Sequence, residues 1–408
     1  MSILEGKVAS TRHNQPLADH PQRGARSPIA ILGDAMKLHR LATVMFAIVI
    51  VFIAFQIANS TFLGVQNLWN MSVQIVPVGL LALGLVFVLL VGEIDLSSAA
   101  LSGVAATIAA RMAINGGEPL VVAVIVAIVV AVAFTSLEAL IIVAGVPSLI
   151  VTLGGMIALG GALLVALTSS FEVNTAGTTF GSVGNFAFAP YAGWIIGVVV
   201  SLCCVALLIR EERMGYRGRP SSRQLVMLVV KSVITLAVIA LVIEELNRGG
   251  GFPLPLLILI VLLVAANWFL RSTSYGVHLY AVGGNRDAAR RAGVRVRSFV
   301  FLSFAVLGVC AALSGLISAA YVGGVSAASG PSSLVLDAIA AVVIGGVSLS
   351  GGKGSAWAAL VGAILIGSIA DGVVLLGLAT QIQDFVTAGM LVLAVSIDSF
   401  SFKALFRR

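Results

Sequence analysis

Six acidic residues lie within or beside the long apolar runs of this chain, and their carboxyl groups are the side chains there most able to do chemistry. Ionisable groups inside apolar runs are costly to bury and are usually functional. Glu138 and Asp371 lie deepest, where they could pair with each other or with Lys231. They could also bind a polar solute or relay protons, and the residues alone leave these uses open. The six are Glu93, Asp95, Glu138, Asp337, Asp371 and Asp384.

Uncharged polar residues near expected helix starts form a second candidate group. A neutral solute needs hydrogen-bond donors and acceptors more than net charge, so these side chains suit a solute pathway. The alternative is structural, because polar side chains also cap helices and join them. Asp95 and Ser97, at the start of an expected helix, are the clearest candidates for a cap. The predicted pathway residues are Asn70, Gln74, Glu93, Asp95, Ser97, Ser148, Thr152 and Asp371.

The segment 283–293 predicts one short helix that carries its own end signals. Asn285 suits the N-cap, and Gly293 can adopt the left-handed conformation after the last turn. The helix dipole favours an acid in the first turn and bases in the last, where the sequence has Asp287, Arg290 and Arg291. Three alanines give a small, smooth face that could dock into a groove on another protein: Ala288, Ala289 and Ala292. A solvated loop that only fixes the membrane topology is the alternative.

These candidates must be positioned by membrane helices. Of the 408 residues, 59% are hydrophobic and only 10% are charged. A helix needs about 20 apolar residues to cross a bilayer, and backbone groups in lipid must be satisfied within their own segment. We predict an all-α polytopic membrane protein. Twelve segments fit, or ten if the short runs 96–112, 254–270 and 335–350 are re-entrant or broken. They are 41–59, 71–91, 96–112, 119–144, 148–168, 192–209, 225–243, 254–270, 298–322, 335–350, 355–378 and 383–398.

The distribution of positive charge predicts the orientation. The polar N-terminal segment 1–40, the loops 210–223 and 271–297, Lys353 and the C-terminal end hold 21 of the 24 Lys and Arg residues, since only Arg111, Lys231 and Arg248 fall elsewhere. Positive residues concentrate on the cytoplasmic side. We therefore expect both termini in the cytoplasm, a disordered N-terminal tail (1–40), a membrane domain (41–398) in contact with lipid, and a short tail (399–408). The net charge of +7 then requires no nucleic-acid partner.

Neither an enzyme nor a nucleotide-binding site is expected in this chain. The four histidines lie in polar segments without catalytic or metal-ligand spacing. Gly351-Gly352-Lys353-Gly354 is superficially similar to a phosphate-binding loop, but Val347 and Gly354 stand where the motif needs Gly and Ser or Thr. Residues 92–97 and 345–350 share a weak internal sequence similarity, the pattern G-x-[IV]-x-L-S. It is consistent either with a parallel repeat, as transporters often have, or with chance.

Four motifs in order give the chain a family resemblance. It resembles the membrane permeases of bacterial ABC sugar importers, the ribose/xylose/galactose group, and most closely the xylose type. The resemblance covers about residues 41–398. The motifs are Gly92-Glu93-Ile94-Asp95-Leu96-Ser97; Val146-Pro147-Ser148-Leu149-Ile150-Val151-Thr152-Leu153-Gly154; Tyr280-Ala281-Val282-Gly283-Gly284-Asn285 with Ala288-Ala289 and Gly293; and Leu336-Asp337-Ala338-Ile339-Ala340-Ala341-Val342-Val343-Ile344-Gly345-Gly346 through Ser350-Gly351-Gly352-Lys353-Gly354-Ser355.

The resemblance implies a homodimeric translocation subunit in the bacterial inner membrane. Separate ABC ATPase subunits would bind ATP and Mg²⁺, and an external binding protein would deliver a monosaccharide, with xylose or a related aldose favoured. The segment contacting the ATPase would comprise Gly284, Asn285, Arg286, Asp287, Ala288, Ala289, Arg290 and Gly293. The chain departs from the family in Glu93, where Gly is usual, and in an added hairpin over 210–250, by which it resembles the xylose-type members. A secondary transporter driven by an ion gradient is the alternative.

Overall fold

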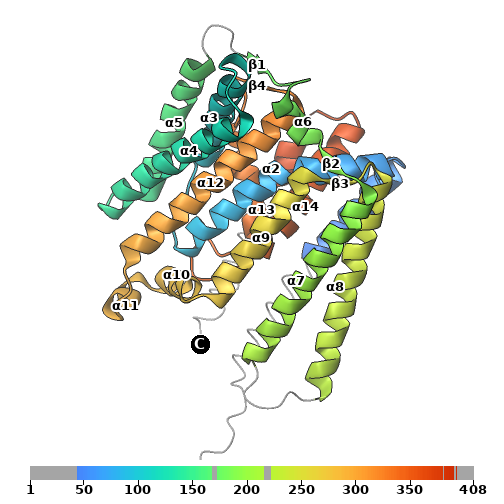
Figure 1. Cartoon of the computed structure of the whole chain (residues 1–408). Coiled ribbons are helices and arrows are strands. Elements are labelled where there is room, and N and C mark those ends of the chain that lie inside the picture. Colours follow the sequence, from blue (N-terminus) through green and yellow to red (C-terminus); the bar gives the residue numbers. More distant parts are fainter. Residues whose placement is uncertain (1–43, 168–171, 216–221, 380, 390–391, 393–408) are drawn as a thin grey trace, which may run out of the picture. The chain divides into compact units, whose positions relative to one another are not determined.

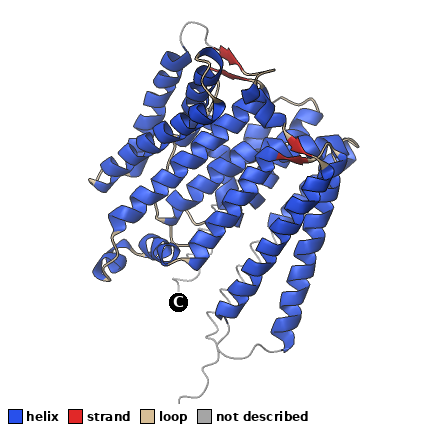
Figure 2. Ribbon diagram, viewed as in Figure 1, coloured by secondary structure: helices blue, strands red, loops and turns tan. Residues whose placement is uncertain are grey.

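The computed structural model describes residues 44–167, 172–215, 222–379, 381–389 and 392. The predicted tails 1–40 and 399–408, and much of the predicted segment 383–398, lie outside this part. The described chain is dominated by helices, with two short two-stranded sheets (Figures 1 and 2). The helices are Val44–Ala58, α2 (Val65–Leu90), α3 (Ser98–Ala110), the π-helical turn η1 (Arg111–Asn115), α4 (Leu120–Val143), α5 (Ser148–Leu167), α6 (Thr179–Asn185), α7 (Pro190–Gly215), α8 (Ser222–Arg248), α9 (Leu254–Ser272), α10 (Ser274–Gly284), α11 (Arg286–Arg291), α12 (Val296–Val322), α13 (Ser332–Ile344), α14 (Trp357–Leu375) and the helical residues 381–389.

Eight of the described helices are long and apolar enough to cross a membrane: α2, α4, α5, α7, α8, α9, α12 and α14. The predicted short segments differ in outcome. The segment 96–112 becomes the 13-residue α3 followed by η1, and 335–350 becomes the 13-residue α13. Helix α13 is too short to span alone, whereas the 13 residues of α3 continue without a break into the five residues of η1. The segment 254–270 is instead part of the unbroken 19-residue α9, so the possibility of a break there was wrong.

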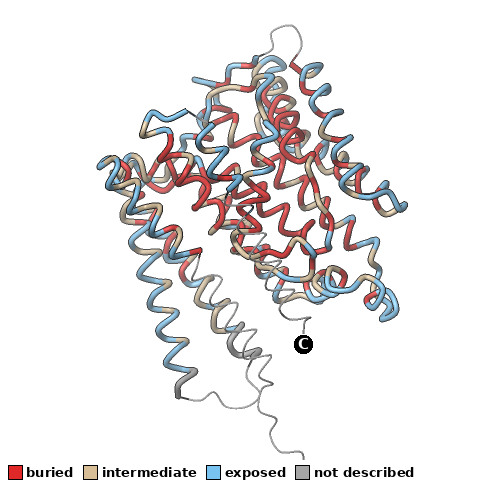
Figure 3. The backbone as a smooth tube through the Cα atoms, turned by 180° about the vertical axis from the view of Figure 1, so that it is seen from behind, coloured by how far each residue is buried: buried red, intermediate tan, exposed pale blue. Residues whose placement is uncertain are grey.

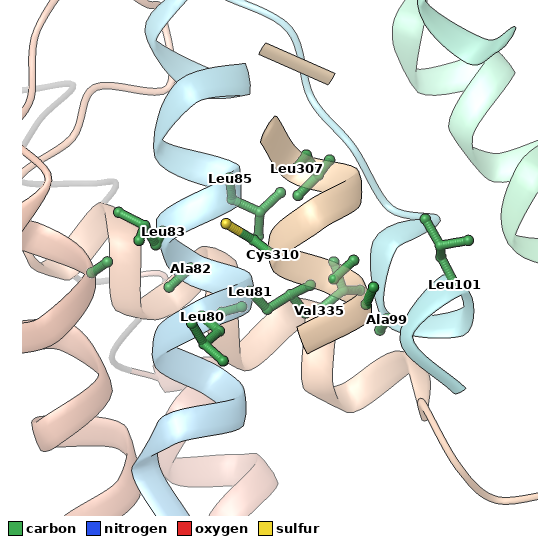
Figure 4. Close-up of a cluster of buried hydrophobic side chains, with 14 of the residues drawn as sticks. Leu80, Leu81, Ala82, Leu83, Leu85, Ala99, Leu101, Leu307, Cys310 and Val335 are labelled. Atoms are coloured by element: carbon green, nitrogen blue, oxygen red, sulfur yellow. The ribbon is translucent and has the colours of Figure 1, made fainter. Parts of the chain in front are cut away.

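Helix α2 lies at the centre of the described helices and packs against α9, α12, α13 and α14. From Ile75 to Leu90 its sequence is apolar on every side, which is the pattern of a buried helix. Figure 4 shows Leu81 and Leu85 of α2 on the side of α12, where Leu307 and Cys310 lie, and Leu83 on the opposite side of the helix. Gly84 allows α12 to approach closely, because a Cβ there would meet Leu307 and Cys310 at 2.8 and 2.9 Å. The Ser314 hydroxyl of α12 donates to the Pro77 carbonyl at 2.7 Å. Because of this close packing, α2 could move only if the helices packed against it also moved.

Helix α4 packs on α12 through small residues at every fourth position. Residues four apart lie on the same helix face, and small side chains let two backbones approach closely. Gly308 of α12 completes the contact, since a Cβ there would meet the Val132 Cα at 2.9 Å. The remaining surfaces of α4 and α5 are apolar and largely exposed, as expected for helices facing lipid. The buried small residues of α4 are Ala123, Ala127, Ala131, Thr135 and Ala139.

The predicted added hairpin over 210–250 is formed by α7 and α8, which pack against each other. Figures 1 and 3 show the two helices side by side, with mostly exposed surfaces on α8. The hairpin is joined to the other helices at one end. There β2 (Ala187–Phe188) pairs with β3 (Phe252–Pro253), and the Trp69 indole N–H of α2 donates to the Gly251 carbonyl at 2.9 Å. The hairpin therefore begins earlier than predicted and contains two apolar helices, with Lys231 exposed on α8.

The two ends of the helices carry different structures. At one end β1 (Glu172–Asn174) pairs with β4 (Gly324–Ser326), and α6 packs on the last turns of α12. At the other end lie α10 and α11, just before α12 begins (Figure 1). The 27 residues of α12 separate the two ends by about 40 Å, at 1.5 Å per residue. We call them the strand end and the α11 end.

Candidate functional site

The predicted helix within 283–293 is confirmed as α11, and so are its end signals. The Asn285 side chain accepts a hydrogen bond from the Ala288 amide at 2.9 Å, as an N-cap should. Gly293 has a φ of +84°, and the amide of Val294 donates back to the Ala289 carbonyl at 3.0 Å. This is the Schellman termination that favours glycine. The local sequence therefore determined the helix and both of its ends.

The alanine face predicted for docking is divided between two environments. Ala289 is 5% exposed and packs inside the protein, whereas Ala288 and Ala292 are exposed. The exposed surface of α11 also carries Asp287 and Arg290. A partner would therefore meet a mixed charged and small surface, without Ala289. The prediction that all three alanines form one docking face was wrong on this point, because α11 uses Ala289 to pack on its own chain.

Arg286 joins α11 to the end of α2. Its Nη2 atom lies 2.5 Å from the Glu93 Oε1 atom and 2.9 Å from the Val91 carbonyl oxygen. The Glu93 side chain is 8% exposed and that of Arg286 is 41% exposed. A charge-assisted contact to a largely buried carboxylate is stronger than an ordinary surface pair. The structure thus places Glu93, predicted for the solute pathway, beside the segment predicted for ATPase coupling.

Glycines hold three chain segments together at the same place. A Cβ on Gly283 would overlap the Leu90 carbonyl oxygen and the Gly352 amide nitrogen, and that amide donates to the same Leu90 oxygen at 2.9 Å. The Tyr280 hydroxyl donates to the Gly354 carbonyl, also at 2.9 Å. We call the segments 90–93, 283–286 and 350–354 the glycine junction. In the sequence these segments belong to three separate motifs, and their shared glycine content is the only local signal of contact.

The two segments of similar sequence, 92–97 and 345–350, lie at the ends of α2 and α13, and these helices end in a similar way. At the end of α2, Gly92 has a φ of +79° and the Glu93 amide donates to the Val88 carbonyl at 3.1 Å. At the end of α13, Gly346 has a φ of +106° and the Val347 amide donates to the Val342 carbonyl at 3.1 Å. Both are Schellman terminations, and their glycines are offset by one residue in the sequence pattern. Gly345, which aligns with Gly92 in the sequence pattern, has a right-handed helical conformation, so the similar helix ends do not explain the sequence pattern.

A second group of predicted residues meets where the α2–α3 turn contacts α4 and α5. The Ser97 hydroxyl lies 2.9 Å from the Asp95 Oδ2 atom and 3.1 Å from the Glu138 Oε2 atom. Asp95 Oδ1 accepts the Ser98 amide at 2.8 Å, so the predicted cap on this helix start is confirmed for Asp95. The Ile94 amide contacts the Ser148 hydroxyl at 3.4 Å. We call Asp95, Ser97 and Glu138 the buried acid site, because each is at most 3% exposed.

The remaining predicted pathway residues lie nearer the strand end. Asp371 of α14 accepts a hydrogen bond from the Asn67 amide at 2.6 Å, and it has no bond to Glu138 among the described contacts. Gln74 of α2 donates to the Tyr321 hydroxyl of α12 at 3.2 Å. Asn70 accepts from Gln66 at 3.3 Å. The predicted pathway residues therefore fall into three places along the helices: the glycine junction, the buried acid site and the strand end.

No group of three His, Cys, Asp or Glu side chains that could hold a metal ion occurs among the residues that the structure describes. The geometry offers a polar helix surface at the α11 end, tied to the central helix, and uncharged polar groups toward the strand end.

The sequence profile of the family described as branched-chain amino acid transport system / permease component matches residues 67–395. The chain belongs to this permease family. It is 35% identical to the xylose transport system permease protein XylH of Haemophilus influenzae, over 87% of this chain and 95% of that protein. It is 32% identical to XylH of Escherichia coli, over 84% of this chain and 86% of that protein. The permease is thus a multi-pass membrane transport component. No solved structure matches it.

A more distant relative covers less of the permease. The ribose import permease protein RbsC of Escherichia coli is 29% identical over 38% of this chain and 48% of that protein. The two XylH proteins match much more of the permease at higher identity. The predicted resemblance to sugar permeases is therefore confirmed, and its emphasis on the xylose type agrees with the relatives found.

Proposed function

We propose that this permease is the translocation subunit of an ATP-binding-cassette importer for xylose or a related aldose. Its partners are separate ATPase subunits, which bind ATP and Mg²⁺, and an external sugar-binding protein. The subunit acts as a homodimer in a bacterial inner membrane, with both termini and the α11 end in the cytoplasm. The names of the XylH relatives support the substrate class. The concentration of positive residues in the segments beside α11 supports the orientation.

The observation that carries the proposal is the glycine junction. A short helix with an exposed charged surface has a direct polar contact to α2, through Arg286 and Glu93. The same region contacts the turn before α14 through Gly283 and Gly352. A force applied to α11 by an ATPase would therefore reach two helices of the core. Interfaces between packed helices respond to such a force by changing between discrete arrangements.

The sugar pathway is proposed for the polar groups toward the strand end. Gln74, which is exposed, and Tyr321 present an amide and a hydroxyl from α2 and α12. Amide and hydroxyl groups both donate and accept hydrogen bonds, as neutral sugar hydroxyls require. Asn70 lies one turn from Gln74 on α2. Asp371 fits a structural role better, because its carboxylate is occupied by Asn67.

An ion-gradient-driven secondary transporter is the second candidate function. The observation that favours it is the buried acid site, since paired carboxyl groups inside a membrane protein occur in proton relays. The two candidates differ in their energy source. A gradient-driven carrier transports alone and stops when a protonophore collapses the gradient, whereas the proposed importer depends on its ATPase subunits.

Affinity purification from native membranes in mild detergent tests the proposal. A C-terminally tagged permease should retain a P-loop ATPase in near-equal amount, and a control membrane protein with the same tag should not. Reconstitution of the purified complex with the external binding protein should give ATP-dependent uptake of xylose that a protonophore leaves unchanged. A permease that arrives alone, and that transports xylose alone in liposomes with a proton gradient, would contradict the proposal.

A further inference from the structure

The hydrogen bonds of the buried acid site require one more proton than Asp95, Ser97 and Glu138 ordinarily carry at neutral pH, where carboxyl groups are ionised. Ser97 Oγ is within hydrogen-bond distance of a carboxyl oxygen of Asp95 and one of Glu138. A serine hydroxyl has one proton, and an ionised carboxylate can only accept. Ser97 can therefore donate to one of the two carboxyl groups. The other contact is a hydrogen bond only if that carboxyl group carries a proton and donates it to Ser97.

The surroundings of the two carboxyl groups assign this proton to Glu138. Asp95 accepts at both oxygens, from the Ser98 amide and from Ser97, and it lies at the positive end of the α3 dipole. These features stabilise an ionised carboxylate. The Glu138 Oε1 atom is buried and has no hydrogen-bond partner in the described part of the chain. Leaving a buried charged oxygen unsatisfied costs more than leaving a neutral one.

The resulting hydrogen bonds run in one consistent direction. The protonated Glu138 donates to the Ser97 oxygen, and the Ser97 hydroxyl donates to Asp95. The Ser98 amide donates to the other Asp95 oxygen. Every contact then has one donor and one acceptor, and the site carries a single negative charge.

Charged groups on the neighbouring elements do not replace the proton. Glu93, two residues before Asp95, pairs with Arg286. Arg111, which follows α3, donates to the Ala166 carbonyl of α5. No described hydrogen bond or ion pair joins Asp95 or Glu138 to a basic residue. The other ionisable groups on the packed helices, none of them in such contact, are Arg297, Cys310 and Tyr321 of α12 and Asp337 of α13.

Two further hydroxyl groups show that the surroundings are polar and enclosed. The Ser98 and Thr152 hydroxyls are fully buried and have no partner among the described residues. Thr152 lies one turn before Gly155 on α5. A Cβ on Gly155 would overlap the Glu138 Oε1 atom and would meet the Ser97 Cβ at 3.2 Å. Thus α5 closes over the carboxyl pair and brings an unpartnered hydroxyl to the same face.

We propose that Asp95, Ser97 and Glu138 form a binding site for one proton, which fastens the α2–α3 turn to α4 beneath α5. The proton resides on Glu138 while the three segments are packed together. Its loss would leave two carboxylates competing for one hydroxyl, and their repulsion would favour separation of α3 from α4. The equilibrium between packed and separated states would then depend on pH. This inference goes beyond the proposed function and does not depend on it.

Infrared spectroscopy of the purified full-length protein in lipid nanodiscs tests the site directly. A protonated carboxyl group has a carbonyl-stretching band separate from those of carboxylates and amides, and this band shifts in D₂O. The spectrum of the wild type minus that of Glu138→Gln at neutral pH should contain such a band, equal to one carboxyl group per chain. Glu118→Gln, which changes an exposed acid, is the matched control and should give no such difference.

The variant Asp95→Asn decides which carboxyl group holds the proton. It also allows the infrared test to be made if Glu138→Gln does not fold. The band should remain in Asp95→Asn, shifted by the weaker hydrogen bonding of Ser97. Loss of the band in Asp95→Asn with retention in Glu138→Gln would overturn the assignment to Glu138. A difference spectrum without a protonated-carboxyl band at neutral pH would overturn the site itself.

Thermal unfolding supplies a second measurement. A folded state that holds one more proton than the unfolded state loses stability as pH rises. The Tm of the wild type should therefore fall between neutral and alkaline pH, and Glu138→Gln should flatten this part of the curve. Identical pH dependence in the two proteins, measured alongside Glu118→Gln, would contradict the proposal.

Discussion

Arg286 and Glu93 are 193 residues apart in the sequence, and their side chains meet at 2.5 Å. The same Arg286 Nη2 atom also contacts the Val91 carbonyl oxygen at 2.9 Å. One guanidinium group therefore satisfies a buried carboxylate and a backbone group beyond the last turn of the central helix. This contact connects α11 directly to the end of α2, so α11 is not an independent surface loop.

Replacement of Arg286 by alanine should destabilise the protein and weaken its transport activity. Hydrogen bonds to charged groups contribute about 1.5–3 kcal/mol, but Arg286 is 41% exposed, and solvent screening reduces the expected loss to about 1 kcal/mol. The Tm in detergent and uptake in liposomes measure the two effects. Arg290→Ala, which removes an exposed arginine from the same helix, is the control for stability and should leave the Tm unchanged.

A double-mutant cycle separates the pair from its members. Arg286→Ala leaves Glu93 buried without its cation, so Arg286→Ala with Glu93→Gln should be less destabilising than the sum of the two single changes. Additive losses of Tm would show that the two side chains act independently, contrary to the contact.

Gly283→Ala should disrupt the glycine junction, whereas Gly284→Ala should not. A Cβ at position 283 would overlap backbone atoms of Leu90 and Gly352, which cannot move aside as a flexible side chain can. Overpacking of this kind costs about 1–3 kcal/mol. At position 284 a Cβ meets nothing within 4 Å. The Tm and the amount of protein in the membrane should fall for Gly283→Ala alone, and equal behaviour of the two variants would contradict the close packing.

The sequence predicted features that depend on neighbouring residues better than features that depend on distant ones. The caps of α11 depend on Asn285 and Gly293, which lie within the motif itself, and both were predicted. The burial of Ala289 depends on how α11 packs on the rest of the chain, so helix periodicity could not reveal it. Glu93 was assigned to the pathway as an acid beside an apolar run. Its partner Arg286 belongs to a motif nearly 200 residues away.

Hydropathy identified the membrane class and most of the apolar helices, but it could not define every span. The run 96–112 is mostly apolar, yet the structure changes from α-helix to π-helix at Arg111. Hydropathy does not register hydrogen-bond geometry, so this change left no signal. The contact of Asp95 with Glu138 through Ser97 was also missed. Two acids 43 residues apart become neighbours only once α4 is packed beside α3.

Changes on the exposed surface of α11 should remove the ATPase without unfolding the permease. Ala288 is exposed, so Ala288→Arg should insert normally, retain its Tm and lose the co-purifying ATPase. Arg290→Glu should act in the same way by reversing a charge. Ala289→Arg should instead lower the amount of folded protein, because an arginine cannot be buried there without a partner. Ser298→Arg, on an exposed position of α12 at the same end, should retain the ATPase. Retention by Ala288→Arg and Arg290→Glu would remove α11 from the interface.

Replacement of the neighbouring α5 residues Gly154 and Gly155 by alanine should have different effects on the Tm. Gly154→Ala adds a methyl group where nothing lies within 4 Å, and alanine favours a helix by up to about 1 kcal/mol over glycine. This variant should keep or raise the Tm. Gly155→Ala places its methyl group against the Glu138 carboxyl group, which must turn away from Ser97. The Tm should therefore fall, and the infrared band assigned to Glu138 should shift.

The shorter side chain of aspartate should relieve the clash in Gly155→Ala. Glu138→Asp withdraws the carboxyl group by one methylene, which makes room for the added methyl group on α5. The double variant Gly155→Ala with Glu138→Asp should therefore have a higher Tm than Gly155→Ala alone. In the wild-type background Glu138→Asp should lower the Tm, because the shorter acid no longer reaches Ser97. Such a reversal of sign is the signature of two residues in direct contact, and a Glu138→Asp effect of equal size in both backgrounds would place Gly155 away from the buried acid site.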